Sequence, residues 1–94
     1  MKKKILFIIN PISGVGRHRT VEKLIDEKLD RKNFDYELSY TKASRHAIEL
    51  SKQGAKENFE IIVAVGGDAS VNEVGRSLVG TKSSLAILPC GSGN

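Results

Sequence analysis

The residues that bear most directly on chemistry lie in three glycine-rich segments, each of which follows an apolar run: Asn10–Arg17, Val65–Glu73 and Gly91–Asn94. Glycine lets the backbone turn sharply and approach a ligand closely, and the amides at the start of a following helix donate hydrogen bonds to anions. This combination predicts a phosphate-binding site. For the first segment alone, a tight turn with solvated arginines explains the same residues equally well.

The second segment combines Gly66 and Gly67 with a carboxylate, Asp68. A carboxylate repels a bound polyphosphate unless it binds a cation such as Mg²⁺, holds a ribose hydroxyl, or caps the following helix. The residues alone leave these roles open. Two common nucleotide fingerprints are absent, because no G-x-x-x-x-G-K-[ST] occurs and Arg19 stands where the dinucleotide pattern needs its third glycine. The sequence therefore supports neither a P-loop NTPase nor an ordinary dehydrogenase.

The spacing of apolar residues predicts the strands and helices that would position these segments. Continuous apolar runs predict strands covered on both faces, at Ile5–Ile9, Ile61–Val65 and Leu85–Leu88. The alternating segment Tyr36–Tyr40 predicts a more exposed edge strand. Apolar residues at helical spacing predict helices over about residues 17–32, 44–57 and 70–79.

This order of elements predicts an α/β fold, with an open parallel sheet of about four strands, helices on both faces and the strand order 2-1-3-4. In that order the chain reverses direction across the sheet between the first and third strands. The loops after Ile9 and Val65 then open side by side at the carboxyl ends of the strands, where ligands bind in such folds.

Composition sets limits on size, compartment and partners. The 94 residues, 39% of them hydrophobic, are enough for one core, and the net charge is +4. The only basic run is Lys2–Lys4, which a solvated amino terminus explains, and aromatic residues are too sparse for a nucleic-acid platform. A single cysteine, Cys90, forms no intramolecular disulfide, so a cytoplasmic location is expected. No apolar run approaches about 20 residues, so any membrane contact is expected to be peripheral.

Three isolated side chains carry little chemistry of their own. His18 and His46 have no neighbouring cysteine or second histidine, so each is expected to be solvated or locally hydrogen-bonded rather than a metal ligand. Cys90 follows Pro89 at a strand end and is expected to be a small buried residue rather than a nucleophile.

Four motifs, in order along nearly the whole chain, resemble the catalytic domain of the diacylglycerol kinase family, whose relatives include sphingosine and ceramide kinases. They are Asn10-Pro11 with Ser13-Gly14, Thr41 with His46-Ala47, Gly66-Gly67-Asp68 with Asn72-Glu73, and Leu88-Pro89 with Gly91-Ser92-Gly93-Asn94. The resemblance implies a Rossmann-like fold of the NAD kinase and diacylglycerol kinase type. It also implies transfer of the ATP γ-phosphoryl group to a lipid hydroxyl.

On this resemblance the motif residues form the nucleotide site. Asn10 and Gly66-Gly67 would lie against the nucleotide, Thr41 near the adenosine part, and Asp68 near the phosphates or their Mg²⁺. Ser92 and Asn94 would line the phosphate end. The full set of expected ATP-binding residues is Asn10, Pro11, Ser13, Gly14, Thr41, Gly66, Gly67, Asp68, Ser70, Asn72, Glu73, Gly91, Ser92, Gly93 and Asn94, with Asp68 as the metal ligand.

The chain departs from the family pattern in two places. Ala69 stands where the family usually has glycine, and it would be strained and weaken ATP binding if that position needs a positive φ. The family also continues beyond a position equivalent to Asn94 into a β-rich second domain. On this reading the chain, residues 1–94, is an N-terminal nucleotide-binding fragment without the catalytic base or most of the lipid site, and is inactive alone. Three alternatives remain: an NAD kinase-like enzyme, a non-catalytic nucleotide-binding module, and an α/β interaction domain.

Overall fold

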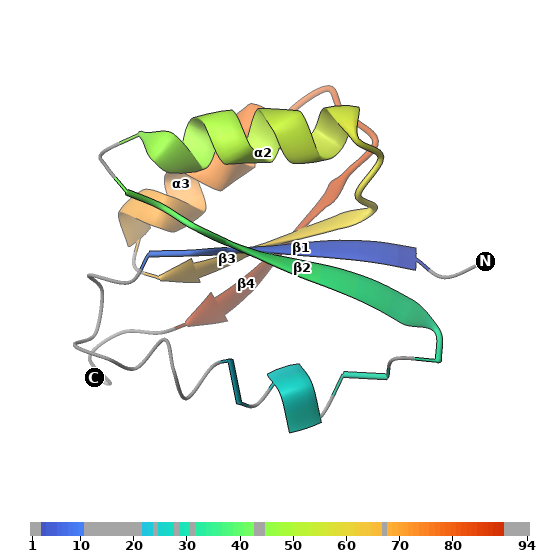
Figure 1. Ribbon diagram of the computed structural model, residues 1–94. Coiled ribbons are helices and arrows are strands. Elements are labelled where there is room, and N and C mark those ends of the chain that lie inside the picture. Colours follow the sequence, from blue (N-terminus) through green and yellow to red (C-terminus); the bar gives the residue numbers. More distant parts are fainter. Residues whose placement is uncertain are drawn as a thin grey trace.

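The computed structural model describes residues 3–10, 22–23, 25–27, 29–30, 32–42, 45–66 and 68–89. Its centre is a parallel sheet of four strands in the order β2-β1-β3-β4 (Figure 1). The strands are β1 (Lys3–Ile9), β2 (Phe34–Tyr40), β3 (Ile61–Gly66) and β4 (Ser84–Pro89), and the helices are α2 (His46–Lys56) and α3 (Asp68–Leu78). The expected strand order and parallel sheet are confirmed.

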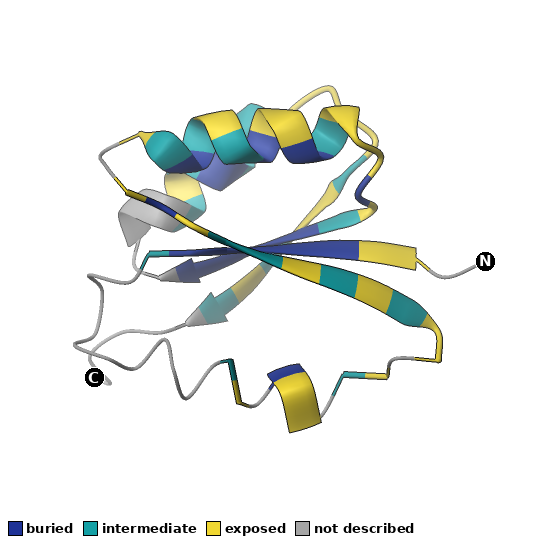
Figure 2. Ribbon diagram, viewed as in Figure 1, coloured by how far each residue is buried: buried dark blue, intermediate teal, exposed yellow. Residues whose placement is uncertain are grey.

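Both faces of the central strands are buried, as their unbroken apolar runs require (Figure 2). Alternate side chains enter two separate cores. One core lies between the sheet and the segment that contains Ile25, and it consists of Ile5, Phe7, Ile9, Ile25, Val63 and Val65. The other lies beneath α2 and α3 and consists of Leu6, Ile8, Ala47, Phe59, Ile62, Ala64, Val74 and Leu78. Helical structure thus covers both faces of the sheet, as expected.

Helix α2 packs closely on the sheet because its buried face is made of small residues. Ala47, Ser51 and Gly54 are buried along this face, and the Ser51 hydroxyl donates to the Ala47 carbonyl oxygen at 2.6 Å. Helix α2 ends at Lys56, and two residues later Asn58 has a φ of 68°. The next residue, Phe59, donates its amide to the Gly54 carbonyl oxygen at 3.1 Å. This left-handed C-terminal cap turns the chain into β3 and buries the Phe59 ring in the core.

The first predicted helix ends earlier than expected. Residues 22–23 and 25–27 are helical, but the backbone bends at Leu29 and forms a turn at 32–33, so the expected end near residue 32 is wrong. Asp30 explains the early end, because its carboxylate accepts the Lys32 amide at 3.0 Å and the Asn33 side-chain amide at 2.6 Å. These local hydrogen bonds compete with helix continuation. Val21 and Leu24 are apolar residues at helical spacing within this predicted helix, and they lie outside the described residues.

Two further expectations need correction. Strand β4 was expected to be covered on both faces, but it forms an edge of the described sheet, and Leu85 and Ile87 are 39% and 54% exposed. Lys4 is also more than a solvated amino-terminal side chain. Its ammonium group donates to the Glu57 carbonyl oxygen at 3.1 Å and lies 4.4 Å from the centre of the Phe59 ring. It therefore ties β1 to the C-terminal end of α2.

Candidate functional site

The carboxyl ends of three strands lie side by side at one edge of the sheet, at the left of Figure 1. Beyond the end of β1, the Asn10 amide donates to the Val65 carbonyl oxygen of β3 at 3.2 Å. Beyond the end of β2, the Thr41 amide donates to the Ile9 carbonyl oxygen of β1 at 2.9 Å. The carboxyl ends of the first, second and third strands therefore lie at the same edge, as the predicted strand order requires.

Helix α3 begins at this same edge. Gly66 is the last residue of β3 and Asp68 is the first residue of α3, so a single residue separates strand from helix. The amides of a first helical turn have no partner within the helix, and the helix dipole adds positive potential there. The backbone thus offers hydrogen-bond donors to an anion next to Asn10, with the acidic residue Asp68 at the same point.

Ala69 is the second residue of α3. Helical backbone has a φ near −63°, so the condition under which an alanine would be strained at this position is not met. Ser70 belongs to the same first turn, and Asn72 and Glu73 follow on the next one. Asn72 is exposed and Glu73 half-buried, and the Glu73 carbonyl oxygen accepts the Ser77 hydroxyl at 2.8 Å.

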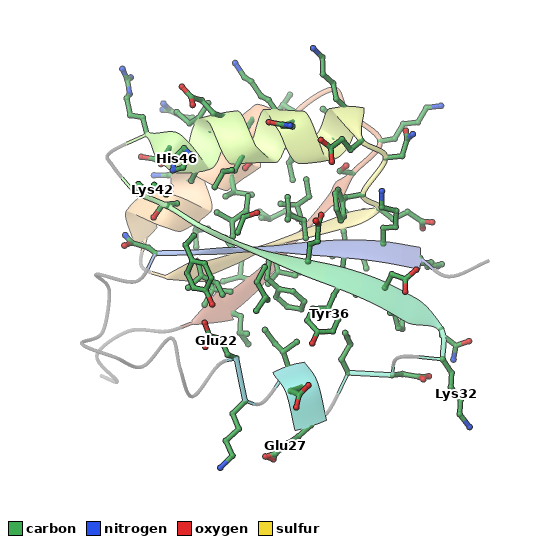
Figure 3. The ribbon with its side chains drawn as sticks, viewed as in Figure 1. Glu22, Glu27, Lys32, Tyr36, Lys42 and His46 are labelled. Carbon is green, nitrogen blue, oxygen red and sulfur yellow. The ribbon has the colours of Figure 1, made fainter. Side chains whose placement is uncertain are left out.

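The turn after β2 brings together Thr41, Lys42 and His46. Thr41 is buried, with 8% of its surface exposed, at the end of an otherwise half-exposed strand. The Lys42 amide donates to Nδ1 of His46, the first residue of α2, at 2.9 Å (Figure 3). His46 is therefore locally bonded, one of the two outcomes expected from the sequence. The sequence does not predict this partner, because no spacing rule links an imidazole to a backbone amide four residues earlier.

The structure describes only part of the expected site. It places Asn10, Thr41, Gly66, Asp68 and Ser70 at the carboxyl edge, with Asn72 and Glu73 farther along α3. The remaining expected residues lie outside the described part of the chain, namely Pro11, Ser13, Gly14, Gly67, Gly91, Ser92, Gly93 and Asn94. The same holds for Arg17, His18, Arg19 and Cys90.

Asp68, the metal ligand expected from the sequence, is the first residue of α3. Within the described ranges, no three side chains of histidine, cysteine, aspartate or glutamate gather in a metal-binding group. Mg²⁺ is commonly held by one or two carboxylates together with substrate phosphates, so a single Asp68 beside the amides of α3 fits that mode of binding. Among the described helices, neither the length nor the apolar content needed to cross a bilayer is reached.

A hollow of about 520 Å³ lies at the opposite end of the molecule, where α2 and α3 end. Its lining includes Lys52, Lys56 and Lys82. Helix C-termini carry partial negative charge, which explains the basic residues there, whereas the unpaired amides of a helix start lie at the carboxyl edge. The carboxyl edge therefore suits a phosphate group better than this hollow does.

Comparison with known proteins agrees with this geometry. A diacylglycerol kinase of Bacillus subtilis is 27% identical over 98% of this chain and 31% of its own length. Sphingoid long chain base kinase 5 of Saccharomyces cerevisiae is 34% identical over 98% of this chain and 15% of its own length. A solved diacylglycerol kinase structure from Bacillus anthracis superimposes with a TM-score of 0.79 at 29% identity, covering 96% of this chain and 31% of that one.

The chain thus spans about a third of the length of its bacterial relatives. The sequence profile of the diacylglycerol kinase catalytic domain matches residues 4–94, nearly the whole chain. On this match, this chain belongs to the diacylglycerol kinase catalytic domain family.

Proposed function

We propose that this chain supplies the ATP-binding part of a lipid kinase, which transfers the γ-phosphoryl group of ATP to a lipid hydroxyl. The observation that supports the proposal is the meeting of three features at one sheet edge: Asn10 directly after β1, Thr41 directly after β2, and the start of α3 at Asp68. Two of these strand ends are linked directly to their neighbours by backbone hydrogen bonds.

In this proposal the edge holds ATP through backbone more than through side chains. The amides of Gly66-Gly67 and of the first turn of α3 bind phosphate oxygens, since the helix N-terminus favours negative charge. Thr41 contacts the adenosine part. The further nucleotide contacts are assigned to Asn10, Pro11, Ser13, Gly14, Ser70, Asn72, Glu73, Gly91, Ser92, Gly93 and Asn94.

The chemical step is an in-line displacement. The lipid hydroxyl oxygen forms a bond to the γ-phosphorus, the bond from that phosphorus to the β,γ-bridging oxygen breaks, and ADP leaves. Asp68 would hold Mg²⁺, which neutralises charge on the phosphates when bound. We assign the base that takes the hydroxyl proton, and most of the lipid site, to a β-rich second domain of the parent protein, so the 94 residues alone are expected to be inactive.

The acceptor determines where such an enzyme works. Because a lipid hydroxyl lies at a membrane surface, we propose a cytoplasmic protein that contacts the membrane peripherally. Phosphoryl transfer requires the γ-phosphate to be positioned next to the lipid hydroxyl. The nucleotide edge must therefore also be reachable from that surface.

Lipid phosphorylation by the full-length gene product tests the proposal directly. Vesicles that contain diacylglycerol or sphingosine, supplied with ATP and Mg²⁺, should yield phosphorylated lipid. Asp68→Asn should lower the rate about a hundredfold, the usual scale for losing one charge-stabilising group. Asp35→Asn is the matched control, because Asp35 is an exposed carboxylate near the amino end of β2. Phosphorylation of NAD instead of lipid, or wild-type Mg²⁺ dependence in Asp68→Asn, would refute the assignment.

A further inference from the structure

His46 occupies an unusual position for a residue with no assigned role. It is the first residue of α2, at the carboxyl edge of the sheet, and it is half-buried. Its Nδ1 accepts the Lys42 backbone amide at 2.9 Å, so Nδ1 carries no proton and the ring hydrogen lies on Nε2 (Figure 3). The side chain thus fixes a backbone group that immediately follows Thr41.

The hydrogen bond acts on Thr41 through the peptide plane. The Lys42 amide nitrogen belongs to the same planar peptide group as the Thr41 carbonyl, and the N–H and C=O of a trans peptide point in opposite directions. His46 therefore directs the Thr41 carbonyl away from α2. On its other side, the Thr41 amide is held by the Ile9 carbonyl oxygen at 2.9 Å. Both peptide groups that flank Thr41 are fixed, which leaves its backbone little rotational freedom.

Arg45, the residue before His46, has a strained backbone conformation. Arg45 has a φ of 69° and a ψ of 1°, a left-handed conformation that non-glycine residues seldom adopt, and no side chain caps the helix at this point. Its carbonyl oxygen accepts the Ile48 amide at 3.1 Å, so the helix starts immediately after the strained residue. The backbone is therefore strained at Arg45, directly before the residue whose ring accepts the Lys42 amide.

We propose that His46 is a positioning residue for the nucleotide: by holding the Lys42 amide it sets the orientation of Thr41 that the adenosine part of ATP meets. This inference rests on the proposed function, since it concerns the same site. His46 acts through Thr41 and touches neither the phosphates nor the reacting atoms. Its removal therefore weakens nucleotide binding and leaves the chemical step unchanged.

Three variants at His46 and one control variant, all made in the full-length gene product, test this role. His46→Asn keeps an acceptor at the place of Nδ1, whereas His46→Gln moves the amide toward the place of Nε2 and His46→Leu removes the acceptor. Calorimetry should give ATP dissociation constants about fivefold higher for Leu and Gln, the factor that corresponds to one hydrogen bond of about 1 kcal/mol, and within about twofold of wild type for Asn. Lys52→Gln, on the exposed face of α2, should bind ATP like wild type.

The kinetic and spectroscopic readouts separate positioning from general destabilisation. In the lipid kinase assay, the KM for ATP should rise in His46→Leu while kcat and the KM for lipid stay unchanged. Nitrogen chemical shifts of the ring should identify the tautomer protonated at Nε2. If His46→Leu fails to fold, the Asn and Gln pair carries the comparison.

The outcomes distinguish this inference from the proposed function. Wild-type protein that binds no ATP overturns both. Wild-type protein that binds ATP, together with equal affinity in the Leu, Gln and Asn variants, overturns only the role of His46. A ring protonated at Nδ1 also overturns that role alone.

Discussion

Gly54 marks the closest approach of α2 to the sheet, and adding one methyl group there gives a sharp test of the packing. A Cβ at this position would stand 2.6 Å from Cδ2 of Leu6 and 3.1 Å from Cδ1 of Ile62. Carbon atoms in favourable contact are about 3.5–4.0 Å apart. Ile62 is fully buried, so Gly54→Ala must displace the end of the Leu6 side chain or lift the helix.

The magnitude follows from two opposing terms. Replacing glycine by alanine inside a helix normally stabilises it by about 1 kcal/mol. Overfilling a packed core costs about 1–3 kcal/mol. Gly54→Ala should therefore lower the free energy of unfolding by about 1 kcal/mol. Gly75→Ala is the matched control within α3, because its Cβ would meet only Cδ2 of Leu85 at an ordinary 3.5 Å, and it should stabilise the protein by up to about 1 kcal/mol.

Urea unfolding, followed by circular dichroism, measures the difference of about 2 kcal/mol between the two variants. Leu6→Val removes the methyl carbon that the new Cβ would strike, so the cost of Gly54→Ala should shrink in that background by roughly 1 kcal/mol. Equal stabilisation by Gly54→Ala and Gly75→Ala would refute the close approach. An unchanged cost in the Leu6→Val background would show that Leu6 is not the obstacle.

Three other expectations concern single residues. Asn58→Ala should lower the melting temperature by several degrees because its φ of 68° suits alanine poorly, while Asn58→Gly should not; equal melting temperatures would contradict the cap. The Asn33 side chain, then the Lys32 amide, lower the pKa of Asp30 below its ordinary 3.8. The stability contributed by Asp30 is thus fully present above that pH and lost as the pH falls through the lowered pKa, and a carboxyl NMR titration midpoint of 3.8 or higher would refute this. Ala69→Gly should leave ATP affinity unchanged in calorimetry, since Ala69 is helical; tighter binding would indicate strain at alanine.

The sheet could be predicted because its central strands are apolar at every position. Only a strand covered on both faces needs the unbroken run of Ile5–Ile9 or Ile61–Val65, and alternation in Tyr36–Tyr40 correctly indicated an edge. The same rule was wrong for β4. Leu85 and Ile87 are exposed although the strand is apolar, because an apolar run shows which residues tolerate burial and not which neighbours cover them.

Local side-chain hydrogen bonds were the least predictable features. The Asp30 turn ends the first helix early, and the His46 contact fixes the turn after β2, yet both depend on backbone geometry that composition does not encode. Ser51 is fully buried although it is polar, because its hydroxyl finds an acceptor one helical turn earlier. At the candidate site, the meeting of strand ends followed from the predicted topology, whereas the binding roles of individual residues remain predictions.

The pairing of β1 with β3 has a consequence for synthesis of the protein. Ile5 pairs with Ile61, which is 56 residues later in the chain. At about 5–20 residues per second, translation leaves the first strand without this partner for roughly 3–11 seconds. During that interval Ile5–Ile9 is an uncharged, β-prone segment of the kind that associates with other chains. The nascent chain should therefore be most vulnerable to aggregation before β3 emerges from the ribosome.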